Sequence, residues 1–154
     1  MFQRQNQQLI LDRISAVLDA TAETHADSLT ALLDEADRIF IAGAGRSKLV
    51  GNFLAMRLMH AGYDVSVVGE IVTPAIRPGD LLVTISGSGE TEQLIVFTKR
   101  ASALGAKVVL ITTNSRSTIA NLADAVFQIG KSDVYGSVKG MPMGTTFELS
   151  ALCF

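Results

Sequence analysis

The sequence predicts an α/β fold, a three-layer α/β/α sandwich in which helices cover both faces of a five-stranded parallel sheet. Short apolar runs rich in valine and isoleucine recur between residues 38 and 130. Amphipathic segments separate these runs, and Gly62 and Gly105 follow two of them, at positions where glycine commonly ends a helix. Apolar strands that alternate with helices are typical of a parallel sheet buried on both faces.

Residues 2–35 are expected to form two helices ahead of the sheet. The first, Phe2–Asp19, gathers its apolar residues on one side and leaves polar residues for the solvent. The second is expected over Thr24–Glu35, with His25 near its start as a surface residue rather than a metal ligand. The first helix carries no residues that suggest chemistry, so it is expected to pack on its own domain, with an oligomer contact as the alternative.

The core over residues 38–130 is expected to alternate strands and helices. The expected strands are Ile39–Ala42, Asp64–Val68, Leu81–Ile85, Lys107–Thr112 and Ala125–Ile129. The expected helices within the core are Lys48–Ala61, Thr91–Leu104 and a short helix from Thr118. Residues 131–154 are expected to supply a loop and the start of a further helix. No repeat or linker divides the chain, which predicts one domain over residues 1–154.

Composition excludes several classes of function. A formal net charge of −2 and a pI near 5.6 give no electrostatic footprint for nucleic acid or an anionic membrane. No apolar run reaches the roughly 18 residues of a membrane span, and the first residues are too polar for a signal peptide, so we expect a cytoplasmic protein. Cys153 is the single cysteine, and His25 and His60 are the only histidines, so we expect no disulfide and no metal site.

Two glycine- and hydroxyl-rich turns, Gly43–Ser47 and Ser86–Thr91, follow the first and third expected strands. In open parallel sheets a ligand binds where the strand order reverses, and in the order 2-1-3-4-5 that point lies between these two strands. Each turn also leads into a helix N-terminus, whose unpaired amides and positive dipole favour an anion. The turns therefore predict a phosphate-binding cleft suited to a sugar phosphate. Its candidate binding residues are Gly45, Arg46, Ser47, Ser86, Ser88, Gly89 and Thr91.

Other interpretations of the turns remain. Gly43-Ala44-Gly45 begins like a dinucleotide fingerprint, but position 48 is Lys where the third glycine belongs, and no Walker sequence is present. The second turn is similar to the phosphate loop of flavodoxins, yet it follows the third strand, and the chain has no Trp to stack on a flavin. Ser88 could also do no more than cap the helix that follows it.

Four segments, taken together, carry a family resemblance. They are Phe40–Ser47, Ala55–His60, Ser86–Thr91 and Pro142–Glu148. They resemble the sugar isomerase (SIS) domain family, with its flavodoxin-like fold, and within it the 6-phospho-3-hexuloisomerases. The resemblance implies reversible conversion of D-arabino-3-hexulose 6-phosphate into fructose 6-phosphate, the second step of formaldehyde fixation in the ribulose monophosphate pathway. It implies no cofactor.

The resemblance also implies roles for three residues. Glu148 would be the base that moves the carbon-bound proton, His60 the acid–base group for ring opening or for the sugar oxygens, and Arg57 a substrate-binding residue. Each catalytic residue has a plainer alternative. Thr145 to Glu148 has capping-box spacing, so this glutamate could serve only the backbone. His60 could be a histidine favoured by the dipole at a helix C-terminus.

His60 lies about 13 residues along the helix that begins at the first turn, which corresponds to about 20 Å at 1.5 Å per residue. It therefore cannot reach its own cleft. Either it is structural, or a neighbouring subunit presents it to this subunit's turns, which would make the site a property of a symmetric oligomer. We expect a dimer at least, and the resemblance implies a tetramer.

Two departures from the family bear on this interpretation. The segment Gly130–Gly140 is shorter than in many members, and the chain stops at Phe154 within an apolar helical run, so we expect a piece of C-terminal helix to be absent. Two other functions remain open. One is an isomerase of the same family that acts on a pentose, heptose or amino-sugar phosphate, and the other is a non-catalytic sugar-phosphate sensor.

Overall fold

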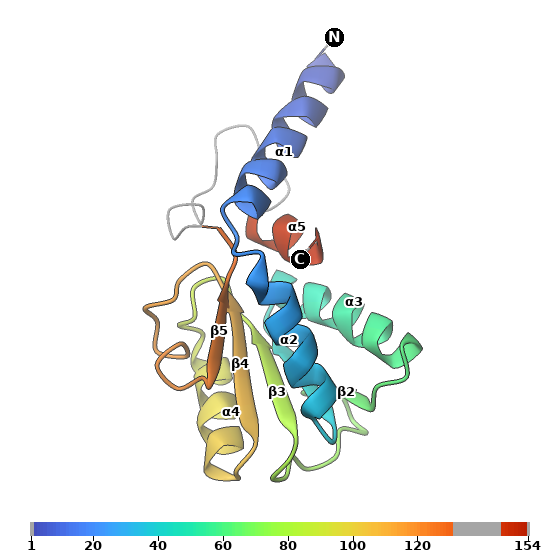
Figure 1. Ribbon diagram of the computed structural model, residues 1–154, viewed down its shortest axis with the longest axis vertical. Helices are drawn as coiled ribbons and strands as arrows, with labels where there is room; N and C mark the ends of the chain where they lie inside the picture. Colours follow the sequence, from blue (N-terminus) through green and yellow to red (C-terminus); the bar gives the residue numbers. More distant parts are fainter. Residues whose placement is uncertain (1, 131–145, 154) are drawn as a thin grey trace.

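The computed structural model describes residues 2–130 and 146–153 (Figure 1). In chain order its elements are α1 (Phe2–Asp19), α2 (Thr24–Glu35), β1 (Ile39–Gly43), α3 (Arg46–His60), β2 (Val65–Val67), β3 (Leu81–Ile85), α4 (Glu92–Ala103), β4 (Lys107–Thr112), β5 (Ala125–Gln128) and α5 (Thr146–Cys153). The predicted strands and the helices α1 to α4 are confirmed, with ends shifted by two residues or fewer. The expected start of a C-terminal helix is confirmed as α5.

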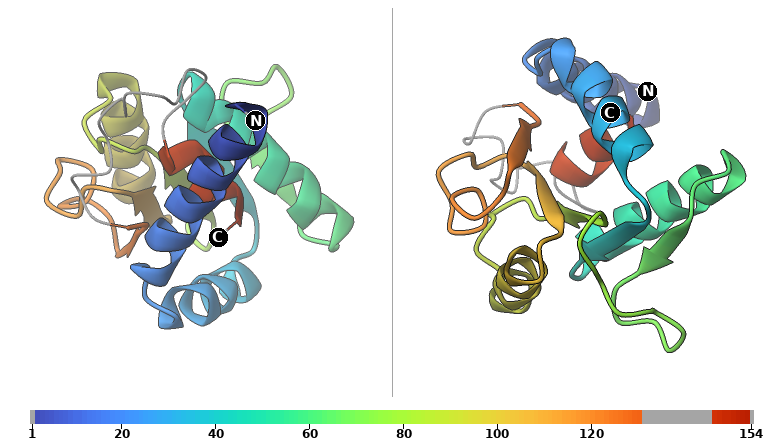
Figure 2. Two further views of the ribbon diagram at one scale, coloured as in Figure 1. Left: turned by 90° about the horizontal axis from the view of Figure 1, so that it is seen from above. Right: turned by 60° about the horizontal axis from the view of Figure 1, so that its bottom comes forward.

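The strands form one parallel sheet in the order β2-β1-β3-β4-β5, which confirms the predicted topology. Helices α2, α3 and α5 cover one face, and α4 covers the other (Figures 1 and 2). Helix α1 adds Val17 near its end to the first face and otherwise extends beyond the edge of the sheet (Figure 1). On the first face Ile41 and Val83 pack in the same cluster as Val50 of α3 and Phe147 of α5. On the second face the strands pack against Leu94 and Ala101 of α4 in a separate cluster. The predicted three-layer sandwich is therefore confirmed.

The prediction of a short helix from Thr118 is wrong. Residues 118–122 form hydrogen-bonded turns instead of a helix. The amide of Thr118 donates to Glu90 Oε1 at 2.8 Å, and the amide of Ile119 donates to the carbonyl of Gly89 at 3.1 Å. Because these amides bind the turn after β3, this segment follows the shape of that turn.

An ion pair at the opposite edge of the sheet fixes how β1 and β3 begin. Arg38 precedes β1, and its Nε and Nη2 donate to Oδ1 and Oδ2 of Asp80 at 3.0 and 2.6 Å. Asp80 precedes β3, is only 2% exposed, and also accepts the amide of Arg77 at 2.6 Å. The hydrogen bond from Arg38 to Asp80 raises the pKa of the guanidinium, against a smaller desolvation effect. This two-point contact aligns the two strands that lead to the predicted site.

Two glycines allow α3 to pack closely on β1. A Cβ atom on Gly43 would lie 2.8 Å from both the amide nitrogen of Lys48 and the carbonyl oxygen of Ser47. A Cβ atom on Gly51 would lie 2.9 Å from Cγ2 of Ile41, which belongs to a side chain. The first turn of α3 therefore lies directly over the end of β1.

No helix among residues 2–130 and 146–153 is long and apolar enough to cross a membrane.

We expect Gly43→Ala to lower the free energy of unfolding by roughly 1–3 kcal/mol, because backbone atoms of α3 would have to move. Gly51→Ala is the matched control. Its clash is with a side chain that can adjust, and alanine gains about 1 kcal/mol of helix propensity over glycine. Urea unfolding of both variants measures the difference. Equal losses of stability would contradict the close backbone approach at Gly43.

Candidate active site

The two predicted turns lie beside each other at the carboxyl edge of the sheet. Gly43 of β1 pairs with Ile85 of β3, and this is the last pair in the register of the two strands. The chain then leaves β1 through the turn to α3 and leaves β3 through the turn to α4. Two helix N-termini, each with a positive dipole end, therefore begin at the same edge of the sheet, at the point where the strand order reverses.

The first turn presents backbone and a cation to the solvent. Gly45 has φ +54° and ψ −128°, a conformation open essentially to glycine, and α3 begins at the next residue. Gly45 and Arg46 are exposed and Ser47 is half-buried. Gly45 is the N-cap residue and has no side chain, so no capping hydrogen bond competes with an anion at this helix start.

The second turn is held by its own hydrogen bonds. The amide of Gly89 donates to Ser86 Oγ at 3.1 Å, and the amide of Glu90 donates to Ser88 Oγ at 3.2 Å. Ser86 and Gly89 are buried, whereas Ser88 and Thr91 are half-buried. The N-cap residue of α4 is Thr91, and its hydroxyl makes no capping hydrogen bond. The alternative in which Ser88 caps α4 is therefore wrong, because Ser88 stabilises the turn itself.

Residues at the end of β4 support this turn, and the sequence analysis did not identify all of them. Thr112 and Thr113 both donate through Oγ1 to the carbonyl of Gly87, at 3.0 and 2.9 Å. Asn114 Nδ2 donates to the carbonyl of Ser88 at 3.2 Å. The sequence feature that could have identified these supporting residues is the pair of hydroxyl side chains at the carboxyl end of the neighbouring strand. Asn114 thus supports the loop from the connection that follows β4.

The connection between β4 and β5 packs against Gly89 and Glu90 of the same turn. Gly89 has φ +67°, and a Cβ atom there would lie 2.0 Å from Ser117 Oγ. Hydrogen bonds from the side chain and the backbone of Thr118 lower the pKa of Glu90, against a smaller effect of desolvation. The turn therefore has supporting contacts from the end of β4 on one side and from the β4–β5 connection on the other.

The structure brings Glu148 to the first turn. Arg46 Nε donates to Glu148 Oε1 at 3.0 Å, although the two residues are 102 positions apart in the chain. The side chain of Glu148 is 13% exposed and that of Arg46 is 58% exposed, so a partly enclosed carboxylate lies beside an accessible guanidinium. Glu148 lies in the first turn of α5. Thr145, its proposed capping-box partner, lies outside the described residues.

A second ion pair flanks the first turn. Lys48 Nζ lies 3.1 Å from Glu70 Oε1, and both side chains remain partly exposed. Glu70 belongs to the connection after β2, whose end reaches the same edge of the sheet. In the same connection Thr73 Oγ1 donates to the carbonyl of Val67 at 2.6 Å, so this hydroxyl stabilises the loop.

His60 is not brought to these turns. It is exposed and is the last residue of α3, about 21 Å from Arg46 at about 1.5 Å per residue. Figures 1 and 2 show α3 running from beside α5 to the outer edge of the molecule. The predicted separation between His60 and its own cleft is therefore confirmed for this chain.

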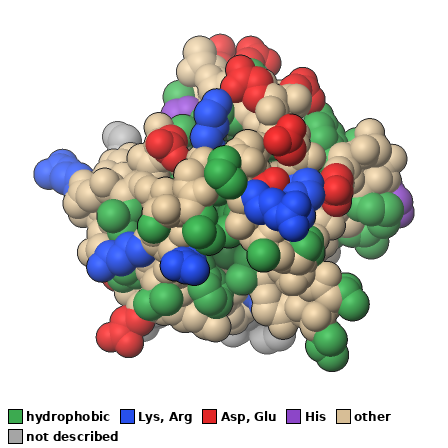
Figure 3. Space-filling model, turned by 90° about the horizontal axis from the view of Figure 1, so that it is seen from below, with side chains coloured by type: hydrophobic (Ala, Val, Ile, Leu, Met, Phe, Trp, Pro, Cys, Tyr) green, Lys and Arg blue, Asp and Glu red, His purple; other side chains and the backbone are tan. Residues whose placement is uncertain are grey.

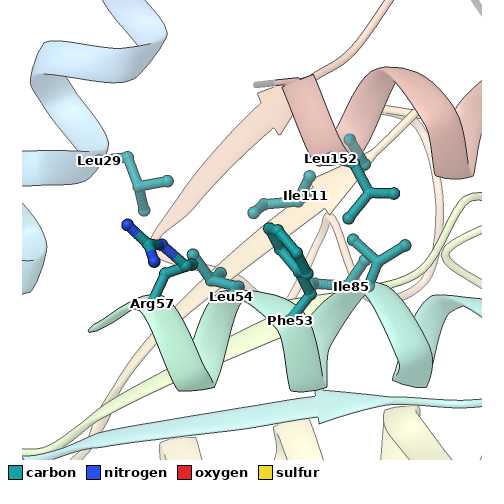
Figure 4. A pocket seen from close by; sticks show the side chains of 9 residues that line it. Leu29, Phe53, Leu54, Arg57, Ile85, Ile111 and Leu152 are labelled. Atoms are coloured by element: carbon teal, nitrogen blue, oxygen red, sulfur yellow. The ribbon is translucent and has the colours of Figure 1, made fainter. Parts of the chain in front are cut away.

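Arg57 lies near the far end of α3, about 16 Å along the helix from Arg46 at about 1.5 Å per residue. It lines a pocket of about 190 Å³ together with Leu29, Phe53 and Leu152, and its guanidinium extends toward Leu29 (Figure 4). Ile85 and Ile111 form the floor of the same pocket. The remaining lining side chains are also aliphatic, so this hollow suits apolar packing better than a sugar phosphate.

Charge and potential metal ligands do not suggest a second kind of site. Within residues 2–130 and 146–153 no group of three or more His, Cys, Asp or Glu side chains could hold a metal ion. On the face seen in Figure 3, Lys and Arg side chains are separated by hydrophobic ones and form no continuous basic stripe. Among the described residues, every predicted site residue except His60 and Arg57 therefore lies at or beside the two turns.

Comparison with known proteins gives a consistent result. The sequence pattern of the SIS domain family matches residues 32–150. The chain is 50% identical over 150 residues to a 3-hexulose-6-phosphate isomerase from Methylomonas aminofaciens, covering 96% of this chain and 83% of that protein. It is 42% identical to the 3-hexulose-6-phosphate isomerase of Bacillus subtilis, covering 84% of this chain and 72% of that protein.

A solved structure has the same fold. The crystal structure of a hypothetical protein from Methanococcus jannaschii, for which a molecular function of 3-hexulose-6-phosphate isomerase was inferred, superposes with a TM-score of 0.83. The two sequences are 33% identical, and the superposition covers 97% of this chain and 84% of that one. On its family pattern, its relatives and its fold, this chain belongs to the SIS domain family.

Proposed function

We propose that this protein interconverts D-arabino-3-hexulose 6-phosphate and fructose 6-phosphate, acting as a single SIS domain in each subunit. The observation that carries the proposal is the contact between Arg46 and Glu148 at the two phosphate-type turns. It places a carboxylate beside the predicted anion site of a chain that is 50% identical to a 3-hexulose-6-phosphate isomerase. The proposed physiological role is the second step of formaldehyde fixation.

In this proposal the sugar's phosphate binds between the two turns. The backbone around Gly45 and the hydroxyls of Ser47, Ser88 and Thr91 surround the crevice, and Arg46 adds a positive charge. Ser86 and Gly89 are buried and shape the second turn rather than line it. Arg57 is too far from the turns of its own chain to bind the phosphate there, so we propose no such role for it within one subunit.

The chemistry moves one proton between two neighbouring carbons. From the open-chain form of fructose 6-phosphate, a base removes the proton on C3 while O2 gains a proton, which gives an ene-diol between C2 and C3. Return of a proton to C2 and loss of the proton on O3 leave the ketone at C3, with no external oxidant or reductant. Glu148 is the proposed base, because its carboxylate is partly enclosed yet lies at the anion site.

His60 is the proposed acid–base group for the sugar oxygens and for ring opening. Since it lies about 21 Å from Arg46 in its own chain, it would act on the site of a neighbouring subunit. This requires a dimer at least, and a tetramer built from such dimers would contain the same pair of sites.

Exchange of carbon-bound hydrogen with heavy water tests the reaction. We expect the protein to place deuterium on C3 of fructose 6-phosphate, whereas an aldose–ketose isomerase would label C1. Glu148→Gln should lower the rate of exchange by roughly 100-fold or more, since a positioned base contributes about that much. NMR of the recovered sugar measures both the rate and the position of the label.

Glu35→Gln is the matched control for this experiment. Glu35 pairs with Lys107 at the opposite edge of the sheet, so its variant should exchange like the parent. Tight binding of fructose 6-phosphate without any exchange would identify a sensor and would contradict the proposed reaction. Label on C1 would identify another isomerase.

Subunit mixing tests whether His60 acts across an interface. We expect His60→Ala and Glu148→Gln proteins to be nearly inactive alone. After equal mixing and subunit exchange, half of the dimers are hybrids with one intact site of two, so about a quarter of parent activity should return. Steady-state turnover before and after exchange gives the result. Hybrids verified by mass spectrometry but still inactive would exclude a shared site.

A further inference from the structure

The carbonyl oxygen of Gly87, in the second turn, accepts more hydrogen bonds than it needs. The hydroxyls of Thr112 and Thr113 donate to it at 3.0 and 2.9 Å, and the amide of Thr113 is a third donor at 3.3 Å. A backbone carbonyl has two lone pairs, and one hydrogen bond satisfies it when it is buried. The excess indicates that the end of β4 controls the direction of this carbonyl.

Both threonine hydroxyls are committed to this contact. Thr112 and Thr113 are 0% and 1% exposed, so they are shielded from water. The hydroxyl oxygen of Thr112 also accepts the amide of Asn114 at 3.0 Å, which leaves its proton for the carbonyl of Gly87. Two buried side chains therefore hold one peptide group of the second turn in a single direction.

The direction of this carbonyl sets the direction of the next amide. No peptide bond among the described residues is cis, so the N–H of Ser88 points opposite to the carbonyl of Gly87. The carbonyl points to the end of β4, and β3 lies between β4 and β1 in the sheet. The amide of Ser88 therefore points away from β4, to the side on which β1 and the first turn lie.

The amide of Ser88 has no acceptor in the part of the chain that the structure describes. The two amides that follow it differ, since those of Gly89 and Glu90 donate to the hydroxyls of Ser86 and Ser88. Ser88 is half-buried, so a ligand can reach it. A backbone N–H that is held in place and lacks a protein acceptor suits an anion.

We propose that Thr112 and Thr113 are positioning residues that aim the amide of Ser88 at the phosphate of the sugar. They act through the peptide group between Gly87 and Ser88 and do not touch the sugar themselves. The inference rests on the proposed function, because it names one donor of the phosphate site and the residues that hold this donor. A hydrogen bond from the amide to a phosphate is charge-assisted, and such bonds are roughly twice as strong as neutral ones.

Replacement of both hydroxyls by methyl groups tests the proposal. In Thr112→Val/Thr113→Val the carbonyl of Gly87 keeps the backbone amide at position 113 as a donor, but it loses the two side chains that fix its direction. Binding of inorganic phosphate, measured by calorimetry, should weaken by roughly tenfold, since a hydrogen bond to a charged group contributes about that factor. KM for the sugar phosphate should rise by a similar factor while kcat changes little, because the phosphate does not react.

Two further variants separate the hydrogen bonds from packing. Thr98→Val makes the same change at a buried threonine of α4 whose hydroxyl has no hydrogen-bond partner among the described residues, so phosphate binding should equal that of the parent. Thr112→Ser/Thr113→Ser keeps both hydroxyls and should recover most of the binding. A serine variant as weak as the valine variant, or a valine variant as strong as the parent, would overturn the proposal.

NMR of the parent protein gives a result even if a variant does not fold. Carbon-13 at the carbonyl of glycine and nitrogen-15 in serine select the amides of Ser88 and Ser137, the two serines that follow a glycine, and Ser137→Ala identifies which is which. Inorganic phosphate should move the amide proton of Ser88 downfield, as a new hydrogen bond to an anion does. A parent protein that binds no phosphate, or whose Ser88 signal is unchanged at saturation, would overturn the proposal.

These outcomes are separate from those of the proposed reaction, because phosphate binding and the Ser88 signal need no turnover. A protein that shows both but exchanges no hydrogen at C3 would keep this inference and exclude the proposed function. A protein that exchanges hydrogen at C3, but whose Ser88 amide does not respond to phosphate, would keep the proposed function and exclude this inference.

Discussion

The parallel register between β1 and β3 is the constraint on which the rest of the site depends. Gly43 pairs with Ile85, so the two strands end level with each other and their turns begin side by side. The ion pair between Arg38 and Asp80 fixes the same register from the opposite edge. A slip of one residue would exchange the two faces of a strand and separate the turns. Because β1 and β3 are buried on both faces, their register is strictly specified.

Once the register is set, the hydroxyls of this edge divide into two groups. Thr112, Thr113 and Ser86 form hydrogen bonds that hold the second turn. Ser47 and Thr91 remain half-buried at the helix starts, where they can face a ligand. A turn that is held by its own hydrogen bonds loses little entropy when a ligand binds to it, which is the general advantage of a preorganised loop. The contact of Arg46 with Glu148 brings to this edge the carboxylate that we propose as the base.

Helix α3 links this site to the surface of the molecule. Its first turn lies over the end of β1 because Gly43 has no side chain, and its inner face packs on the sheet through Val50, Ala55 and Leu58. Its last residue, His60, is exposed. In the proposed function the same helix begins one active site and completes another.

The sequence predicted the order of strands and helices, the two glycine-rich turns and the distance of His60 from its own turn. Hydrophobic periodicity, glycines that end helices or form turns, and the rise per helical residue are all local properties of the chain. The turns from Thr118 could not be predicted, since their amides bind a turn nearly thirty residues earlier in the chain. The pairing of Arg46 with Glu148 and the support of the second turn by Thr112 and Thr113 were likewise decided only by the tertiary structure. Local patterns determine which elements form and which residues end them. Packing decides which distant side chains meet, because that depends on register and on the faces that the core leaves exposed.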